Sequence, residues 1–111
     1  MFDDFLNLCK LYFQEGKIPI VSIQKQDSYY KRIKYLSDNI IKKYGIELFF
    51  GLLQEGQYLT QLWVAHLIIE EDNVDDKMKK KCFEVIIDYS DNPLVPDVSY
   101  AENVWLKSLD S

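Results

Sequence analysis

The segment QYLTQLWVAHLIIEED, residues 57–72, constrains the fold more than any other part of the chain. As a helix it would be apolar on most sides, so it must pack between neighbours rather than lie on a surface. Its apolar run is broken by His66 and is shorter than the ~20 residues that a membrane-spanning helix needs. We therefore expect a central helix buried between two others.

Helical spacing also dominates the rest of the chain. In the first segment, apolar side chains recur three and four residues apart, and Asp3, Asp4 and Gly16 suit the two ends of a helix. Asp27 or Ser28 can cap a second helix that ends at Gly45. The pattern predicts a single all-α domain over residues 1–111, with about six short helices near residues 2–13, 28–44, 46–55, 57–72, 75–89 and 97–109.

Two segments carry signals that interrupt helices. The stretch KIPIVSI, residues 17–23, contains Pro19 among β-branched side chains, which favours an extended connection. The stretch SDNPLVPD, residues 90–97, holds an Asn-Pro and a Val-Pro step and is expected to be a loop before a helix that starts at Asp97 or Ser99.

The helix at 58–67 has a counterpart near the end of the chain. YLTQLWVAHL and YAENVWLKSL align without gaps at an offset of about 42 residues, so that Trp63 matches Trp105. The same alignment pairs Tyr58 with Tyr100 and Leu67 with Leu109. This period is close to that of HEAT and armadillo units, which are helix pairs that stack on their neighbours. The echo predicts stacked antiparallel hairpins, a HEAT-like α-solenoid.

Charge and cysteine content narrow the function. The net charge is −5, and residues 57–111 hold five basic and eleven acidic side chains. Nucleic-acid binding depends on basic side chains, so we expect no nucleic-acid partner and favour a basic protein. Cys9 and Cys82 have no Cys or His near them at metal-ligand spacing, which favours buried free thiols. The start of the chain lacks the basic region of a signal peptide, so a cytoplasmic location without membrane contact is expected.

The second half of the chain resembles small bacterial HEAT-like helical proteins. The resemblance rests on a leucine pair, a polar turn, a helix of the form Trp-x-Ala-x-Leu-Ile and a small residue in the last helix; these positions are Leu52, Leu53, Trp63, Ala65, Leu67, Ile68 and Ala101. Several such proteins are immunity proteins of polymorphic toxin systems, including contact-dependent growth inhibition. The resemblance implies a stacked helical fold and inhibition of a cognate toxin.

No catalytic or metal-binding set is evident. Histidine side chains in general titrate near neutral pH, but among the helical neighbours of His66 only Glu70 is polar, so a packed or partner-facing histidine is favoured over a catalytic one. The acids after it fail the calcium-loop pattern, because the sixth position from Asp72 is Lys77 rather than glycine. We expect no enzyme activity, no metal and no cofactor.

The acids at 70–76 are the best candidates for a docking surface, although a solvated turn is the simpler alternative. Five acids in seven residues repel one another, and a cationic partner would relieve that repulsion. We also expect Asp75 to begin the next helix and to face Lys79, as Asp76 would face Lys80. The predicted function is an immunity protein that occludes a basic nuclease toxin, and the alternative is a helical adaptor with another protein partner. The candidate partner-binding residues are Glu70, Glu71, Asp72, Asp75, Asp76, Asp97, Tyr29 and His66.

Overall fold

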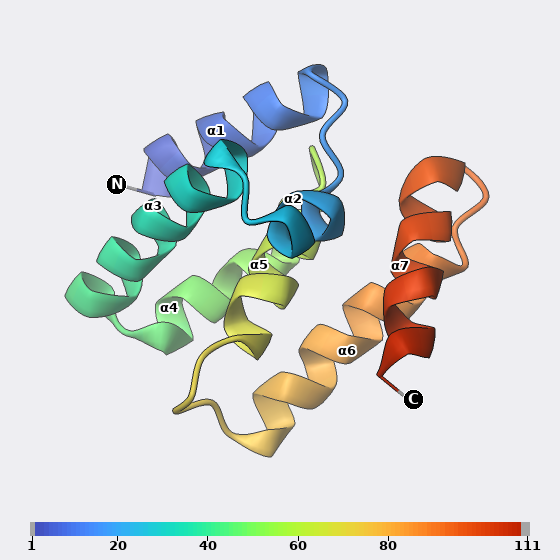
Figure 1. Cartoon of the computed structure of the whole chain (residues 1–111). Coiled ribbons are helices and arrows are strands. Elements are labelled where there is room, and N and C mark those ends of the chain that lie inside the picture. The colour runs from blue at the N-terminus through green and yellow to red at the C-terminus, as the bar shows by residue number, and fades with distance from the viewer. Residues whose placement is uncertain (1, 110–111) are drawn as a thin grey trace.

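The structure, a computed structural model, describes residues 2–109 and is all-helical over that range (Figure 1). Apart from α2, the helices lie close to their predicted places. Their bounds are α1 Phe2–Gln14, α2 Pro19–Lys25, α3 Ser28–Tyr44, α4 Ile46–Phe50, the 3-10 helix η1 Gly51–Gln54, α5 Thr60–Ile69, α6 Asp76–Ser90 and α7 Pro96–Ser108.

Aspartates cap the two longest helices. The Asp27 side chain accepts a hydrogen bond from the Tyr30 backbone N–H at 3.0 Å, and Asp75 accepts one from Met78 at 2.7 Å. Each bond satisfies a backbone donor that has no partner within the first helical turn. Both starts are confirmed as predicted, and α3 ends at Gly45, whose φ of 92° suits glycine.

Helix α5 is the centre of the molecule, as its composition predicts. Every residue from Leu62 to Ile68 is buried. In Figure 1, α3 and α4 lie on one side of α5, and α6 and α7 lie on the other. The core gathers around Trp63, which meets the ring of Tyr12 from α1 at a centroid distance of 5.9 Å. A helix apolar all round is therefore stable here, because it has helices on both sides.

The extended connection predicted for residues 17–23 is wrong. Pro19 begins α2, where its fixed φ is already helical and its missing N–H would have had no partner in any case. Ile20, in the first turn of α2, is buried. The sequence prediction treats proline as a residue that breaks helices, although at the first position of a helix it is a favourable residue. The same applies to Pro96, which begins α7 one residue before the predicted start.

The predicted helix at 46–55 is divided in two. Helix α4 is a short α-helix, and the chain then tightens into η1 from Gly51 onwards. Helix α5 begins at Thr60, later than its apolar pattern suggests, because Tyr58 and Leu59 adopt positive φ values of 57° and 60°. Left-handed backbone at these positions interrupts the helix before α5.

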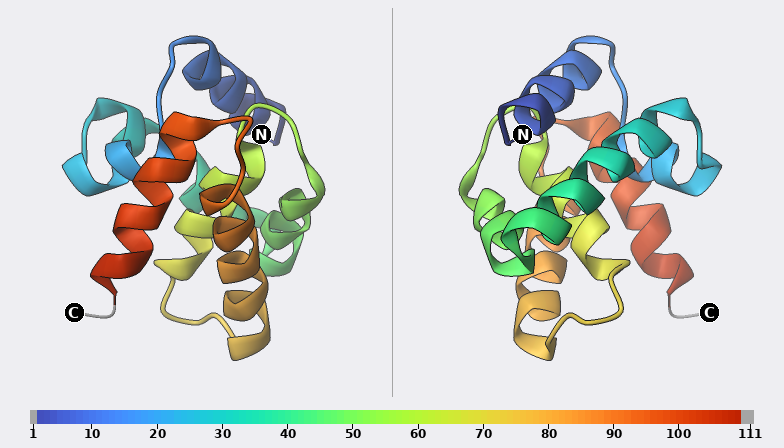
Figure 2. Two further views of the ribbon diagram at one scale, coloured as in Figure 1. Left: turned by 90° about the vertical axis from the view of Figure 1, so that its right-hand side faces the viewer. Right: turned by 90° about the vertical axis from the view of Figure 1, so that its left-hand side faces the viewer.

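The aligned segments of the internal echo occupy different surroundings. Leu62 is fully buried, whereas its counterpart Val104 is 50% exposed. Tyr58 precedes α5 in a left-handed conformation, whereas Tyr100 lies inside α7. Helices α5, α6 and α7 do follow one another up and down (Figure 2), but α5 is central and α7 is at the edge. Across residues 2–109, every helix is too short or too polar to traverse a bilayer.

Candidate functional site

The loop between α5 and α6 displays the predicted acids at one end of the molecule. We define the acidic loop as the five carboxylates Glu70, Glu71, Asp72, Asp75 and Asp76. Four of them are exposed, and Glu71 is half-buried. In Figure 1 the loop projects below α5, away from the N-terminal helix α1. The chain therefore presents these acids together to solvent.

Helix α3 anchors the first two carboxylates of the loop. The Tyr30 hydroxyl donates to Glu70 Oε2 at 2.8 Å, and Lys34 Nζ lies 3.3 Å from Glu71 Oε1. Partial burial, followed by the hydrogen bond to Glu70, raises the pKa of Tyr30 to about 12. Burial lowers the pKa of Lys34, but Asp38 and Glu71 outweigh that effect and raise it overall, so Lys34 stays charged. These contacts hold Glu70 and Glu71 in place.

The remaining carboxylates differ in what they bind. Asp75 is occupied by its capping bond to Met78. Asp72 and Asp76 make no hydrogen bond or ion pair with any residue that the structure describes. The predicted pairing of Asp75 with Lys79 and of Asp76 with Lys80 is absent from the ion pairs in this range. For Asp75 the reason is that it lies outside the helix and turns toward its first N–H groups.

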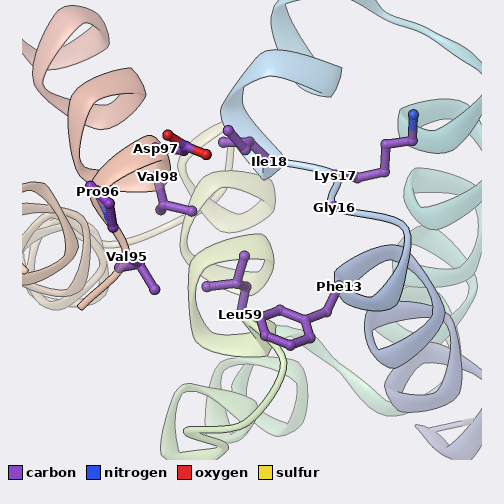
Figure 3. A pocket seen from close by; sticks show the side chains of 9 residues that line it. All are labelled: Phe13, Gly16, Lys17, Ile18, Leu59, Val95, Pro96, Asp97 and Val98. Carbon is purple, nitrogen blue, oxygen red and sulfur yellow. The ribbon is translucent and has the colours of Figure 1, made fainter.

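Asp97 does not belong to the acidic loop. It lies in the first turn of α7, next to Leu59 at the start of α5, whereas the acidic loop follows the end of α5. Figure 3 shows its carboxylate above an apolar pocket, with the Lys17 ammonium pointing away from it. The pocket is lined by Phe13, Gly16, Lys17, Ile18, Leu59, Val95, Pro96, Asp97 and Val98. The sequence could not reveal this separation, because Asp97 resembles the other acids in everything except its place in the fold.

Tyr29 is partly enclosed by its own chain. Its ring packs edge-on against Tyr12 at 5.0 Å, and Lys17 Nζ lies 4.4 Å from its centroid. It packs against the core, as does Tyr30, so neither tyrosine is an isolated surface side chain.

His66 lies inside the protein and binds a residue that sequence reasoning missed. Its Nε2 lies 2.8 and 2.9 Å from the two carboxylate oxygens of Glu102 in α7. His66 is 3% exposed and Glu102 is 0% exposed. Where the Glu102 carboxylate is ionised it can only accept, and Nε2–H is then the donor. Trp105 covers the imidazole edge-on, with ring centroids 4.7 Å apart.

This burial removes His66 from the set of residues that a docking partner can touch. Its polar partner is Glu102 rather than Glu70, which turns toward Tyr30 instead. One signal was present in the sequence: Glu102 falls between Val98 and Trp105, on the side of α7 that faces the core. A lone acid on an inward face calls for a buried donor, and the one histidine of the chain lies in the central helix.

Both cysteines are buried free thiols, as predicted. Burial raises the pKa of Cys9 and that of Cys82 to about 12. A thiol reacts through its thiolate, so both groups are protected from oxidation and alkylation while the protein is folded.

Comparison with protein-family models, with curated proteins and with solved structures gives no match for this chain.

Proposed function

We propose that this protein is an immunity protein, which uses its acidic loop to bind and occlude the basic active-site cleft of a cognate toxin domain. The observation that carries the proposal is the pair of exposed, unpartnered carboxylates Asp72 and Asp76, beside two carboxylates already held in position. The resemblance to helical immunity proteins supplies the class of partner.

The chemistry of the loop suits a basic nuclease. Such an enzyme holds phosphates with Lys and Arg, and carboxylates bind the same side chains through short, charge-assisted hydrogen bonds. Glu70 and Glu71 are held by Tyr30 and Lys34, so less side-chain freedom is lost when a partner binds. The excess of acids in the second half of the chain would also speed association with a cationic protein.

The fold supports a role in binding. The consecutive antiparallel helices α5, α6 and α7 form a continuous layer, and we propose that they correspond to the stacked hairpins of a HEAT-like protein (Figure 2). The His66–Glu102 pair lies beneath Trp105, where a surface substrate cannot reach it, so the proposal assigns no catalysis to it.

The test uses the toxin domain encoded beside the gene for this protein. Co-expression of the two should restore growth, and the purified proteins should form a complex. The double variant Asp72→Lys/Asp76→Lys should raise the Kd by about 100-fold or more and flatten its salt dependence, since two attractive charge contacts become repulsive. No protection and no complex with the unaltered protein would overturn the function.

Glu55→Lys is the matched control. Glu55 is exposed and precedes α5, so it lies at the other end of that helix from the acidic loop. Glu55→Lys changes the net charge as much as Asp72→Lys alone, so these two single variants are compared directly, and only the loop variants should weaken binding. If the loop variants bind as tightly as the control, the interface lies elsewhere on the molecule.

A second candidate is a helical adaptor for a protein that is not a toxin. The apolar pocket beside Asp97 favours it, because that pocket lies away from the acidic loop. Under this alternative the protein binds a partner without protecting cells from any neighbouring toxin, which the same growth assay distinguishes.

A further inference from the structure

The outward face of α7 carries a regular stripe of four side chains. Asp97, Tyr100, Val104 and Lys107 are spaced three, four and three residues apart, so they share one side of the helix. All four are exposed, with Tyr100 at 73% and Val104 at 50%. The opposite side of α7 packs inward through Val98, Glu102 and Trp105. The stripe thus has an apolar centre with an acid at one end and a base at the other.

Helix α2 borders this stripe and makes it one wall of a groove. Ile18, Val21 and Gln24 lie across from Asp97, Tyr100 and Val104. The left view of Figure 2 faces α7 with α2 beside it, and no other helix covers the two in that view. Exposed large apolar side chains that gather in a groove are typical of an interaction surface. A groove between two helices suits a third helix.

The stripe is complementary to itself when a second copy runs in the opposite direction. When two α7 helices run in opposite directions and cross at the level of residue 102, Tyr100 of each copy faces Val104 of the other. The same alignment sets Asp97 of each copy opposite Lys107 of the other. Pairs of positions three and four residues apart that alternate in this way form the seam of antiparallel helix packing. Two apolar layers are then flanked by two ion pairs.

We propose that this protein self-associates as a two-fold symmetric dimer through the α7 stripe, with each α7 lying against the α2–α7 groove of the other copy. A two-fold interface needs one surface that matches itself, and the order acid, apolar, apolar, base has that property in the antiparallel sense. The stripe is also electrically neutral although the chain carries −5, so the repulsion between two acidic copies is least there. A strongly basic partner would be attracted by Asp97 but repelled by Lys107.

The dimer is expected to be weak. From Asp97 to Lys107 the helix rises about 15 Å, which limits the contact to about three turns of α7 and the exposed side of α2. Interfaces below about 1,200 Å² are typical of transient complexes. Kd values in the micromolar range follow, so association must be measured at high concentration.

Sedimentation velocity and light scattering from about 5 to 500 μM test the proposal, with binding strengths compared as Kd values of the dimer. The unaltered protein should shift from monomer toward dimer. Val104→Arg should raise the dimer Kd by about 10-fold or more, because it places two new cations in the apolar centre. Leu48→Arg on α4 is the control, since Leu48 is equally exposed at 56% and lies on another helix, and it should leave the Kd unchanged.

The charge pairs test the antiparallel alignment. Asp97→Lys alone and Lys107→Asp alone should each weaken the dimer, because each sets like charges opposite one another twice. The double variant Asp97→Lys/Lys107→Asp should restore it. Circular dichroism checks that every variant is folded.

Three outcomes overturn the proposal. A protein that is still monomeric at about 500 μM would leave the groove to a foreign helix. Dimerisation that Val104→Arg does not affect would place the interface elsewhere. A double charge swap that stays as weak as the single variants would exclude the antiparallel alignment. None of these outcomes bears on toxin binding by the acidic loop.

Discussion

The buried pair of His66 and Glu102 makes a quantitative prediction about stability. His66→Phe keeps an aromatic ring against Trp105 but leaves the carboxylate of Glu102 without its donor in a site that solvent does not reach. Leaving a buried hydrogen-bonding group without its partner costs about 1–3 kcal/mol, and more where that group is charged. A domain of this kind is stable by only about 5–15 kcal/mol, so the loss is a large share of the total.

The double variant His66→Phe/Glu102→Leu removes both polar partners at once. It tests whether the loss of stability comes from an unpaired polar group rather than from altered packing. Replacing both partners by apolar side chains of similar size is expected to be neutral or stabilising by about 1–4 kcal/mol. Glu102→Gln is a milder change, because its amide oxygen can still accept from Nε2–H, and it should cost about 1 kcal/mol. The single variants His66→Phe and Glu102→Leu and the double variant His66→Phe/Glu102→Leu therefore form a cycle with strong coupling, and Glu102→Gln is a separate comparison.

Urea unfolding followed by far-ultraviolet circular dichroism gives the free energy of unfolding for each variant. Tryptophan fluorescence should report the same transition, since Trp63 is buried in the core and the ring of Trp105 lies against the imidazole. The reasoning is refuted if His66→Phe costs less than about 1 kcal/mol, or if the double variant loses as much as the two singles together.

Three further predictions concern local features. Asp27→Ala should lower the free energy of unfolding by about 1 kcal/mol, because α3 loses its N-terminal cap. An unchanged midpoint of urea unfolding would show that the cap does not stabilise the protein. Gly45→Ala should cost about 1–3 kcal/mol, because φ of 92° with ψ of 157° is a glycine conformation; a thermal melt equal to that of the unaltered protein would contradict this. The thiols of Cys9 and Cys82 have folded pKa values of about 12, above their ordinary 9.0, so their stabilisation is complete below pH 9 and is lost as pH rises toward 12. A free energy of unfolding that does not change between pH 9 and about 12 would contradict this contribution of the two thiols.

The acidic loop shows how far charge patterns can be interpreted from the chain alone. The exposure of four of its five acids follows from their position between two helices, because neighbouring polar residues in a turn face water. Which of these carboxylates lack a hydrogen-bond or ion-pair partner does not follow from their position in the chain. Tyr30 and Lys34 lie about forty residues earlier in the chain, and only the packing of α3 beside the end of α5 brings them to Glu70 and Glu71.

The two prolines that begin helices show the same difference between what the sequence predicts and what packing decides. Pro19 and Pro96 each begin a helix, although the sequence predicts a connection at both positions. Whether the chain beyond each proline is extended or helical depends on burial. Ile20 becomes a core residue only when α2 packs on α5, and that contact stabilises a short helix that local propensity would not sustain.

The sequence by itself determined the properties that depend on neighbours three or four residues away. These are the all-helical class, the caps at Asp27 and Asp75, the burial of the helix around Trp63 and the two buried thiols. The tertiary structure alone decided which distant residues meet. It joined His66 to Glu102 across 36 positions and separated Asp97 from acids of the same kind. The physical reason is that helical periodicity is local, whereas the choice of packing partner depends on how all the helix faces fit together.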